Sequence, residues 1–302
     1  MINSEFIKKK ALELGATTCG IGDISLMKDE PARKNPFQIL PNARTIIGFG
    51  FRIPKALYKT MEDKTQFYTY TSLGVKYIDE TFTEIFLLKL GAIIENAGYD
   101  ACLQRFIPGM KAKGDKSTNP EVKEVYELKY ASPVADGKPA PEVMIDFGLA
   151  AKVCGLGEQG LHGKIIAPKY GTFMRYAFII TDMPLDFDEP FTQTLCDKCG
   201  ECIKACPGHA ISDGGTDSWQ CAVYYRGAHK SNPFMTDEFL KDNPEREKII
   251  NGEKKFDRET ALEVLEEIDF LPKTHFGYVP CLCGKKCELA CRKHQEELKN
   301  ER

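Results

Sequence analysis

The pattern of apolar and polar positions predicts alternating helices and strands in the first two-thirds of the chain. Apolar residues recur at helical spacing in residues 4–14, where Ser4 is a candidate N-cap, and again in residues 77–97. The second helix carries its apolar face on Ile78, Phe82, Ile85, Phe86 and Ile93. Runs of β-branched and aromatic residues predict buried strands at 44–51 and 175–181. This alternation is typical of an α/β or α+β domain.

Two stretches depart from this pattern. Residues 108–141 are rich in proline, glycine, lysine and aspartate, which predicts a long loop. Loops of this length are usually functional or mobile. Apolar residues return at helical spacing in residues 259–271, so we expect a helical insert at residues 230–275 within a charged segment.

Charge and hydropathy exclude several classes of partner. The 302 residues include 41 Lys and Arg and 44 Asp and Glu, a net charge of −3. Nucleic acid is therefore an unlikely partner, because a strong basic field is missing. No run reaches the roughly 18 apolar residues of a membrane span. The N-terminal residues resemble no export signal, so we expect a cytoplasmic protein that does not enter a membrane.

The cysteines change this picture of an ordinary globular chain. Nine of the 12 lie between Cys196 and Cys291, after the proline-bounded segment Pro184–Pro190. We therefore expect a first domain at residues 1–190 and a second at residues 191–302. In a reducing compartment, clustered cysteines usually bind metal and do not form disulfides.

The spacing of the first four clustered cysteines indicates iron–sulfur chemistry. The run C-x2-C-x2-C-x3-C-P at residues 196–207 reproduces the bacterial ferredoxin spacing, in which the fourth cysteine ligates a second cluster. We expect one [4Fe-4S] cluster on the first cysteine set: Cys196, Cys199, Cys202 and Cys291. A second cluster would be held by the second cysteine set: Cys206, Cys221, Cys283 and Cys287.

The later cysteines leave one assignment open. Cys283, Cys287 and Cys291 are spaced i, i+4, i+8, so on a helix they would share one face. Cys281 is close enough in sequence to replace Cys283 as a ligand. Two adjacent clusters would carry single electrons, and the remaining question is what they reduce.

A glycine-rich motif lies before the cysteines. Residues 155–160 match G-x-G-x-x-G, but a dinucleotide fingerprint must leave a strand and open a helix. Here the motif follows a helical pattern, and Gly163 and Pro168 prevent a long helix after it. The glycines still indicate a close backbone approach, either to another element or to a flat cofactor.

Four features of the sequence together resemble the cobalamin-dependent reductive dehalogenase and epoxyqueuosine reductase superfamily. They are this motif, the Pro-x-Tyr-Gly turn at residues 168–171, the segment Thr-Asp-Met-Pro-Leu at 181–185 and the cysteine spacing. The resemblance implies a nitroreductase-like domain that holds a base-off corrinoid, followed by a ferredoxin domain with two clusters. It places the corrinoid against Gly155, Leu156, Gly157, Gly160, His162, Gly163, Lys164, Pro168 and Tyr170.

The resemblance also implies a catalytic pair. Tyr77 matches the tyrosine that donates a proton, and Arg175 matches the basic residue that stabilises the phenolate. A guanidinium beside a phenol favours the phenolate and makes the phenol a better acid. Tyr68 and Tyr70 are alternatives to Tyr77.

The sequence thus predicts a corrinoid-dependent iron–sulfur reductase that acts on a small molecule. An external low-potential donor, such as a ferredoxin or a flavodoxin, would supply single electrons, and the clusters would pass them to cobalt. Two alternatives stay open: an electron relay that reactivates another corrinoid protein, and a flavin-containing enzyme on a nitroreductase-like fold. The identity of the substrate and the oligomeric state are not encoded in any motif.

Overall fold

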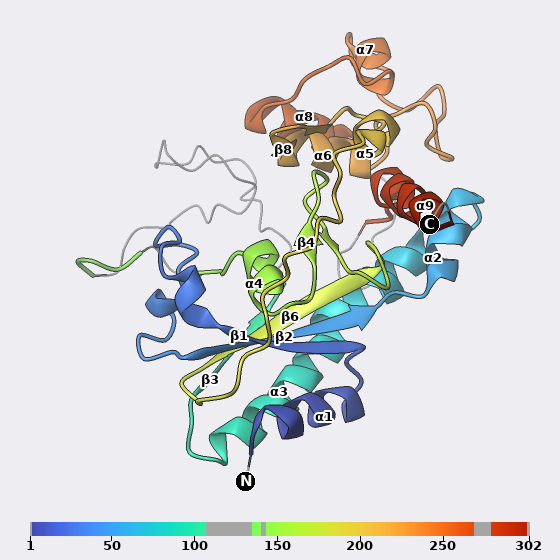
Figure 1. Cartoon of the computed structure of the whole chain (residues 1–302). Coiled ribbons are helices and arrows are strands. Elements are labelled where there is room, and N and C mark those ends of the chain that lie inside the picture. Colours follow the sequence, from blue (N-terminus) through green and yellow to red (C-terminus); the bar gives the residue numbers. More distant parts are fainter. Residues whose placement is uncertain (1, 107–134, 140–142, 269–278, 301–302) are drawn as a thin grey trace.

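The structure, a computed structural model, comprises a sheet lobe, up to residue 189, and a cysteine-rich lobe after it (Figure 1). The ranges that it describes are residues 2–106, 135–139, 143–268 and 279–300. Most of the predicted loop at 108–141 therefore lies outside the described residues.

The sheet lobe is built around four antiparallel strands. Its strands and helices are α1 (Ser4–Glu13), β1 (Thr18–Asp23), β2 (Thr45–Arg52), α2 (Lys55–Glu62), α3 (Thr83–Glu95), β3 (Ala101–Arg105), α4 (Phe147–Val153), β4 (Glu158–Gln159), β5 (Ile165–Ile166) and β6 (Met174–Thr181). The sheet has the order β1-β2-β6-β3, while β4 and β5 form a separate small hairpin. Both predicted strands are confirmed as the central pair β2 and β6, which register Ile47 opposite Ile179.

Both faces of this sheet are buried, which explains the continuous apolar runs in its central strands. On one face, Ile47 of β2 and Ile179 of β6 pack with apolar residues of α1 and α3. On the other face, Ile46 and Phe178 pack with α4. Alternate residues of each strand thus enter two different cores.

The long helix predicted at residues 77–97 is only partly correct. The helical region begins earlier than predicted. Two π-helical segments, η3 (Tyr70–Lys76) and η4 (Ile78–Phe82), come first, and α3 follows them directly in the chain. The wider π turn moves the apolar face, so that Phe86 is buried while Phe82 and Ile85 are 41% and 50% exposed. The residues that α3 buries instead include Leu87, Leu90 and Ile94.

The N-cap prediction for α1 is wrong by one residue. The Asn3 side chain accepts a hydrogen bond from the backbone N–H of Phe6. Ser4 Oγ donates instead to the carbonyl oxygen of Asp186, 3.0 Å away. The Ser4 hydrogen bond therefore connects the start of α1 to the segment that precedes Cys196.

The cysteine-rich lobe is mainly helical, and its core is separate from those of the sheet. Its elements are α5 (Glu201–Ala205), β7 (Ile211–Ser212), β8 (Gly215–Thr216), α6 (Ser218–Tyr225), α7 (Arg246–Ile250), α8 (Arg258–Glu267) and α9 (Lys286–Asn300). Within the expected helical insert at 230–275, α8 begins with a capping box at Asp257 and buries Ala261 and Leu265. Residues 269–275 lie outside the described residues, and the bounds of the insert stay a prediction.

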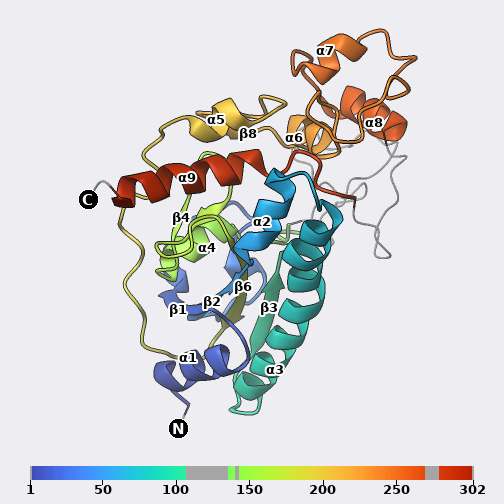
Figure 2. The same ribbon diagram turned by 90° about the vertical axis from the view of Figure 1, so that its right-hand side faces the viewer.

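Helix α9 connects the two lobes. It lies between α5 and the sheet lobe and beside α2 (Figure 2). A shared apolar core contains Tyr58, Met61 and Tyr70 of the sheet lobe together with Cys281 and Leu282, which precede α9. The division into a domain at residues 1–190 and a second at residues 191–302 stays a prediction.

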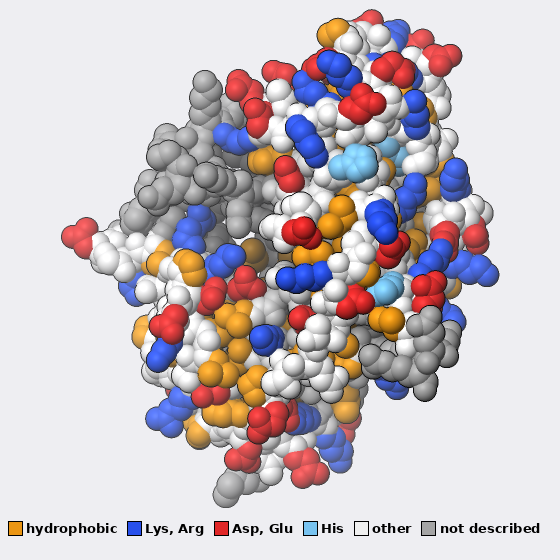
Figure 3. Space-filling view, turned by 45° about the horizontal axis from the view of Figure 1, so that its top comes forward, with side chains coloured by type: hydrophobic (Ala, Val, Ile, Leu, Met, Phe, Trp, Pro, Cys, Tyr) orange, Lys and Arg blue, Asp and Glu red, His pale blue; other side chains and the backbone are white. Residues whose placement is uncertain are grey.

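Within the described part of the chain, no helix combines the length and apolar composition needed to span a lipid bilayer. On the face that Figure 3 presents, basic and acidic side chains are interspersed.

Candidate functional site

The four cysteines of the first cysteine set line one cavity, although Cys291 lies 89 residues after Cys202. Cys202 comes from α5 and Cys291 from α9, and these two helices pack together. Burial, and after it the neighbouring thiols Cys202, Cys196 and Cys199, together raise the pKa of the Cys291 thiol to about 12. The arrangement can ligate one metal centre with four sulfurs.

Polar contacts hold the first cysteine set in place. Glu158 Oε2 accepts hydrogen bonds from the backbone N–H groups of Leu195, at 2.7 Å, and Cys196, at 3.0 Å. His294 Nε2 lies 2.7 Å from Asp197 Oδ2, which connects α9 to the loop of the first three cysteines. The glycine-rich segment and α9 therefore both position this loop.

The cysteines of the second cysteine set also lie close together, near the C-terminal end of α5. Burial raises the pKa of Cys221 to about 11, with Cys283 as the next cause. Cys221 and Cys287 pack against the small core that contains Cys206. The backbone N–H of Ala210 donates to Cys206 Sγ at 3.3 Å. The thiols of this set are thus close enough to influence one another.

Cys281 is the competitor of Cys283, and the two Sγ atoms are 3.8 Å apart. Cys281 is fully buried in the core shared by the two lobes, and its backbone N–H donates to Thr71 Oγ1. Cys283, by contrast, is among the causes that raise the pKa of both Cys221 and Cys287. This arrangement favours Cys283 as the ligand.

The expectation that Cys283, Cys287 and Cys291 share one helix face is wrong. Helix α9 begins at Lys286, so Cys283 lies in the preceding turn, where Lys285 has a positive φ of 51°. Cys287 and Cys291 are both on α9, one turn apart, and they belong to different sets. The turn redirects the chain, which sequence spacing alone does not reveal.

Arg175 forms a buried ion pair that the sequence did not predict. Its Nε donates to Asp79 Oδ1 at 2.9 Å and its Nη2 donates to Asp79 Oδ2. Asp79 is 2% exposed and lies on η4. Burial opposes the charge of Arg175, but Asp79 outweighs it and raises the pKa of the guanidinium. The guanidinium is therefore fixed in orientation.

The two candidate tyrosines have different environments. Tyr77 is 36% exposed, whereas Tyr70 is fully buried. Burial raises the pKa of Tyr70 and Glu288 adds to this, while Lys285 and Arg175 lower it. Arg175 thus acts electrostatically on Tyr70, which the sequence offered only as an alternative.

Part of the glycine-rich motif serves the fold. It follows helix α4 and leads into the short β4–β5 hairpin, so it is not a strand-to-helix turn. A Cβ at Gly157 would lie 2.2 Å from the carbonyl oxygen of Ile166, and one at Gly155 would lie 2.8 Å from that of Glu189. Leu156 is buried in the core. The two glycines thus approach the chain's own backbone, and Leu156 packs in its core.

The rest of the segment offers polar groups. His162 lines the cavity of the first cysteine set. Its Nδ1 accepts from the backbone N–H of Lys164 at 3.1 Å, while its buried Nε2 has no partner within the described residues. Burial lowers the pKa of His162 to about 4. A neutral imidazole with an Nε2–H donor is therefore available to a bound group.

The remaining residues that were predicted to contact the corrinoid are Gly160, Gly163, Pro168 and Tyr170. A Cβ at Gly160 would contact the His162 ring, and one at Gly163 would meet only Thr216, at 3.6 Å. Pro168 and Tyr170 belong to a turn closed by the pairing of Ala167 with Gly171. The Tyr170 ring lies under the Arg52 guanidinium, 5.4 Å away.

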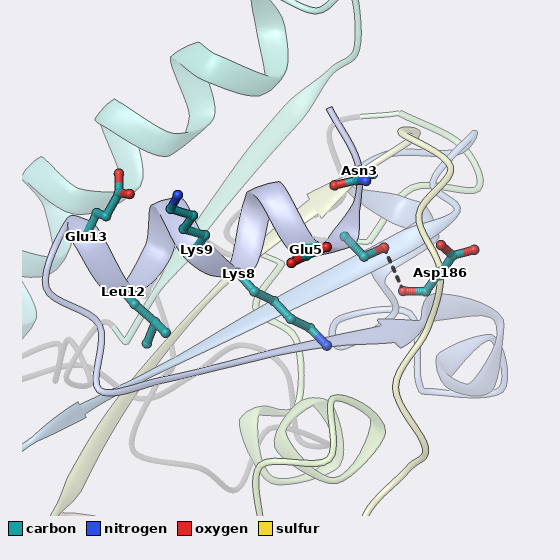
Figure 4. Close-up of a pocket in the computed structure, with 8 residues that line it drawn as sticks. Asn3, Glu5, Lys8, Lys9, Leu12, Glu13 and Asp186 are labelled. Carbon is teal, nitrogen blue, oxygen red and sulfur yellow. Dashed lines mark hydrogen bonds between the residues drawn. The ribbon is translucent and has the colours of Figure 1, made fainter. Parts of the chain in front are cut away.

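Two other hollows differ in their chemistry. A groove of about 760 Å³ along α1 is lined by mixed charges, including Lys8, Lys9 and Glu13, and it lies on the opposite side of the sheet from the cysteines (Figures 1 and 4). A hollow of about 460 Å³ beside the second cysteine set has Cys283 on its wall with Lys64 and Lys286. Only the second hollow borders candidate ligands.

Comparison with known proteins agrees with this arrangement. The 4Fe-4S binding domain family matches residues 190–212. An epoxyqueuosine reductase of Vibrio cholerae is 28% identical over 245 residues, which are 72% of this chain and 57% of that protein. A second, from Cellulophaga algicola, is 28% identical over 74% of this chain and 68% of its own length. The chain thus spans little more than half of the Vibrio protein.

Solved structures show the same fold. A catabolic reductive dehalogenase aligns with a TM-score of 0.52 at 16% identity, over 98% of this chain and 36% of that one. An epoxyqueuosine reductase in complex with a tRNA stem loop aligns with a TM-score of 0.50 at 17% identity, over 95% and 69%. The chain is thus similar in sequence to epoxyqueuosine reductases over about three-quarters of its length, and it shares its fold with a reductive dehalogenase.

Proposed function

We propose that this chain is an iron–sulfur and corrinoid-dependent reductase with two [4Fe-4S] clusters and a nitroreductase-like first domain. The observation that carries the proposal is the cavity lined by all four cysteines of the first cysteine set. All 12 cysteines are free thiols, so each proposed ligand is available to iron. The gathered second cysteine set supports a second cluster at the other end of α5.

The glycine-rich segment supports a corrinoid in part. Gly155, Leu156 and Gly157 pack within the protein, and we propose that they shape the segment without touching the cofactor. The unpartnered Nε2 of His162 supports a polar contact with a bound group. We propose that Gly160, His162, Gly163, Lys164, Pro168 and Tyr170 would hold the corrinoid. When bound, it would supply the cobalt that carries the reduction chemistry.

The chain's own part is to deliver electrons, orient the substrate and supply a proton. Asp79 orients the Arg175 guanidinium, which favours a phenolate nearby and so assists a tyrosine as proton donor. The sequence offered Tyr77 first, with Tyr68 and Tyr70 as alternatives. We propose Tyr70 as the donor, since Arg175 is among the charges that lower its pKa, against the larger effect of burial, which raises it. A low-potential donor such as a ferredoxin or flavodoxin would supply the electrons.

The substrate is proposed as a small molecule, with modified tRNA as the second candidate. The similarity to epoxyqueuosine reductases over 72% of this chain is the observation that supports modified tRNA as a second candidate, and it weakens the expectation from net charge that nucleic acid is not a partner. Turnover assays with an epoxyqueuosine-containing stem loop and with halogenated aromatic compounds separate the two candidates. Turnover of neither would favour the electron-relay alternative.

The cluster assignment is tested by iron and acid-labile sulfide analysis after anaerobic reconstitution. We expect Cys291→Ser and Cys287→Ser each to lose about half of the iron, because they belong to different sets. Cys154→Ser is the matched control, since this buried thiol is bonded to the carbonyl of Ile46. Equal loss in all three variants would contradict the assignment.

A further inference from the structure

One ligand of the first cysteine set has two further metal-binding side chains beside it. Donor atoms of Asp197, Cys199 and His294 all lie within 4.8 Å of one another. His294 and Cys199 also line the same cavity as Cys202 and Cys291. Cysteine, histidine and aspartate are the side chains that bind zinc and related metals in proteins. Among the residues that the structure describes, no other proposed cluster ligand belongs to such a mixed group.

Helix α9 holds the histidine at this point. His294 lies three residues after Cys291, so the two side chains share one face of α9. Nε2 of His294 lies 2.7 Å from Asp197 Oδ2. The next residue, Gln295, donates from Nε2 to the carbonyl oxygen of Leu195 at 3.5 Å. The loop that carries the first three cysteines is therefore fastened to α9 at two points, and the histidine is one of them.

The aspartate orients the imidazole and is itself committed to the turn. Asp197 Oδ1 accepts from the backbone N–H of Cys199 at 3.1 Å. An ionised carboxylate only accepts, so Nε2 of His294 carries the proton in its contact with Oδ2. In the neutral ring the free electron pair then lies on Nδ1. A histidine that gives its other N–H to a carboxylate is the usual arrangement of a metal-ligating imidazole.

Cys199 is the ligand of its set that solvent reaches most easily. It is exposed, whereas Cys202 is buried and Cys196 and Cys291 are half-buried. In tetrahedral zinc sites the bonds to sulfur and nitrogen are about 2.3 Å and about 2.1 Å long, so two such ligands of one ion lie within about 4.4 Å of each other. A separation of up to 4.8 Å therefore needs only a small movement of the exposed Cys199 side chain.

We propose that His294 is a reserve ligand of the first cluster, which binds the iron of Cys199 when that thiolate is displaced. The Fe–Sγ bond breaks with its electron pair left on sulfur, and an Fe–N bond forms with the electron pair of the imidazole. No electron enters or leaves the cluster, and the free thiolate takes a proton from solvent. Imidazole suits iron better than a carboxylate does, which favours His294 over Asp197. This inference rests on the proposed first cluster.

Iron analysis of the reconstituted full chain tests the inference, with alanine in place of single cysteines. We expect Cys199→Ala to keep eight irons, because His294 takes the open position. Cys202→Ala is the matched control and should lose about half of the iron, since Cys202 belongs to no mixed group within the described residues.

A histidine variant identifies the replacing ligand. His294→Gln keeps an N–H that can donate to Asp197 but removes the ring nitrogen, so by itself it should leave the iron content unchanged. Combined with Cys199→Ala, it should reduce the iron by about half. Electron–nuclear double resonance of the reduced chain should show a directly bound nitrogen in Cys199→Ala alone. The potential of the first cluster should also rise in that variant, because a neutral imidazole replaces a thiolate.

Retained iron with a bound nitrogen in Cys199→Ala, and loss of half of the iron in the double variant, would support the inference. Loss of half of the iron in Cys199→Ala would overturn it and leave the proposed function intact. Retained iron without a bound nitrogen, or a nitrogen signal that persists in the double variant, would also overturn it, because another ligand would then replace Cys199.

Two further outcomes separate the inference from its foundation. Loss of iron in His294→Gln alone would overturn the inference, because the histidine would then be required in the unmodified chain and not held in reserve. Equal iron in the unmodified chain and in Cys202→Ala would overturn both the inference and the proposed function, because the first cluster would not form.

Discussion

At the scale of single residues, the most informative contact is the two-bond ion pair between Arg175 and Asp79. A carboxylate that accepts both hydrogen bonds leaves the guanidinium no freedom to rotate, so its positive charge has a fixed location. That location is within electrostatic range of the fully buried Tyr70. Sequence resemblance selected Arg175 but gave no signal for its partner, because a single aspartate on a helical stretch has no distinctive pattern.

The proton donor can be identified with two conservative substitutions. We expect Tyr70→Phe to lower the turnover rate by about 10²-fold or more, the usual contribution of a general acid. Tyr77→Phe should change it by less than about threefold, because in this proposal the partly exposed Tyr77 is not the proton donor. Iron content should be unchanged in both variants. The opposite ranking of the two rates would restore Tyr77 as the donor.

His229 predicts a pH dependence of stability. Burial lowers the pKa of His229 to about 4 from its ordinary value of 6.5. Between these values the unfolded chain binds a proton that the folded chain does not, so stability falls as the pH decreases from 6.5 to 4. The slope is about 1.4 kcal/mol per pH unit for each such histidine. The contribution is complete above pH 6.5.

Urea unfolding at pH 5 and pH 7, followed by the fluorescence of the single tryptophan, Trp219, measures this slope. His162 has the same direction of shift, so His229→Gln should remove about half of the difference between the two pH values. An unchanged difference in the variant would show that His229 is not the source.

At the scale of elements, the sequence predicted the buried strands and several helices well, because their apolar periodicity is strong. It failed where backbone geometry departs from the regular helix. The π turns of η3 and η4 change which side chains of α3 are buried, and the turn at Lys285 separates Cys283 from α9. Neither feature alters the apolar spacing in a way that can be read from one sequence.

The β4–β5 hairpin gives a testable example of such geometry. Gly157 has φ of +155° and would place a Cβ 2.2 Å from the Ile166 carbonyl oxygen. We expect Gly157→Ala to destabilise the protein by roughly 3 kcal/mol or more, from strain and steric overlap together. Gly98→Ala is the control, because Gly98 has positive φ but none of the described residues has an atom within 4 Å of an added Cβ.

The control should cost only about 1 kcal/mol, which reflects backbone strain alone. Both values are measured by urea denaturation. Equal destabilisation by the two substitutions would mean that the close approach of Gly157 to Ile166 is not a structural constraint.

At the scale of the whole molecule, the two lobes share an apolar core and a buried polar cluster. Cys281 and Leu282 pack on Tyr58 and Tyr70, and Tyr58 also donates to Glu288. We expect a chain that ends at residue 190 to lose this cover and to unfold at a lower urea concentration than the intact chain. Size-exclusion chromatography should show association through the exposed residues.

Equal stability of the shortened and intact chains would mean that the lobes fold independently on either side of the predicted boundary at residue 190. The sequence could not reveal this shared core, since its members lie more than 200 residues apart. Cysteine spacing predicted that distant thiols meet, and the first cysteine set does line one cavity. The assignment of ligands to two clusters stays a prediction.

The measurement that tests the central proposal most directly is the cofactor content of the full chain. The chain is purified without oxygen, reconstituted with iron, sulfide and cobalamin, and analysed for iron and for corrin absorbance. The account predicts eight irons and one corrinoid per chain, with a base-off spectrum. Iron without retained corrinoid, or flavin in the extracted cofactor of the chain as purified, would contradict it.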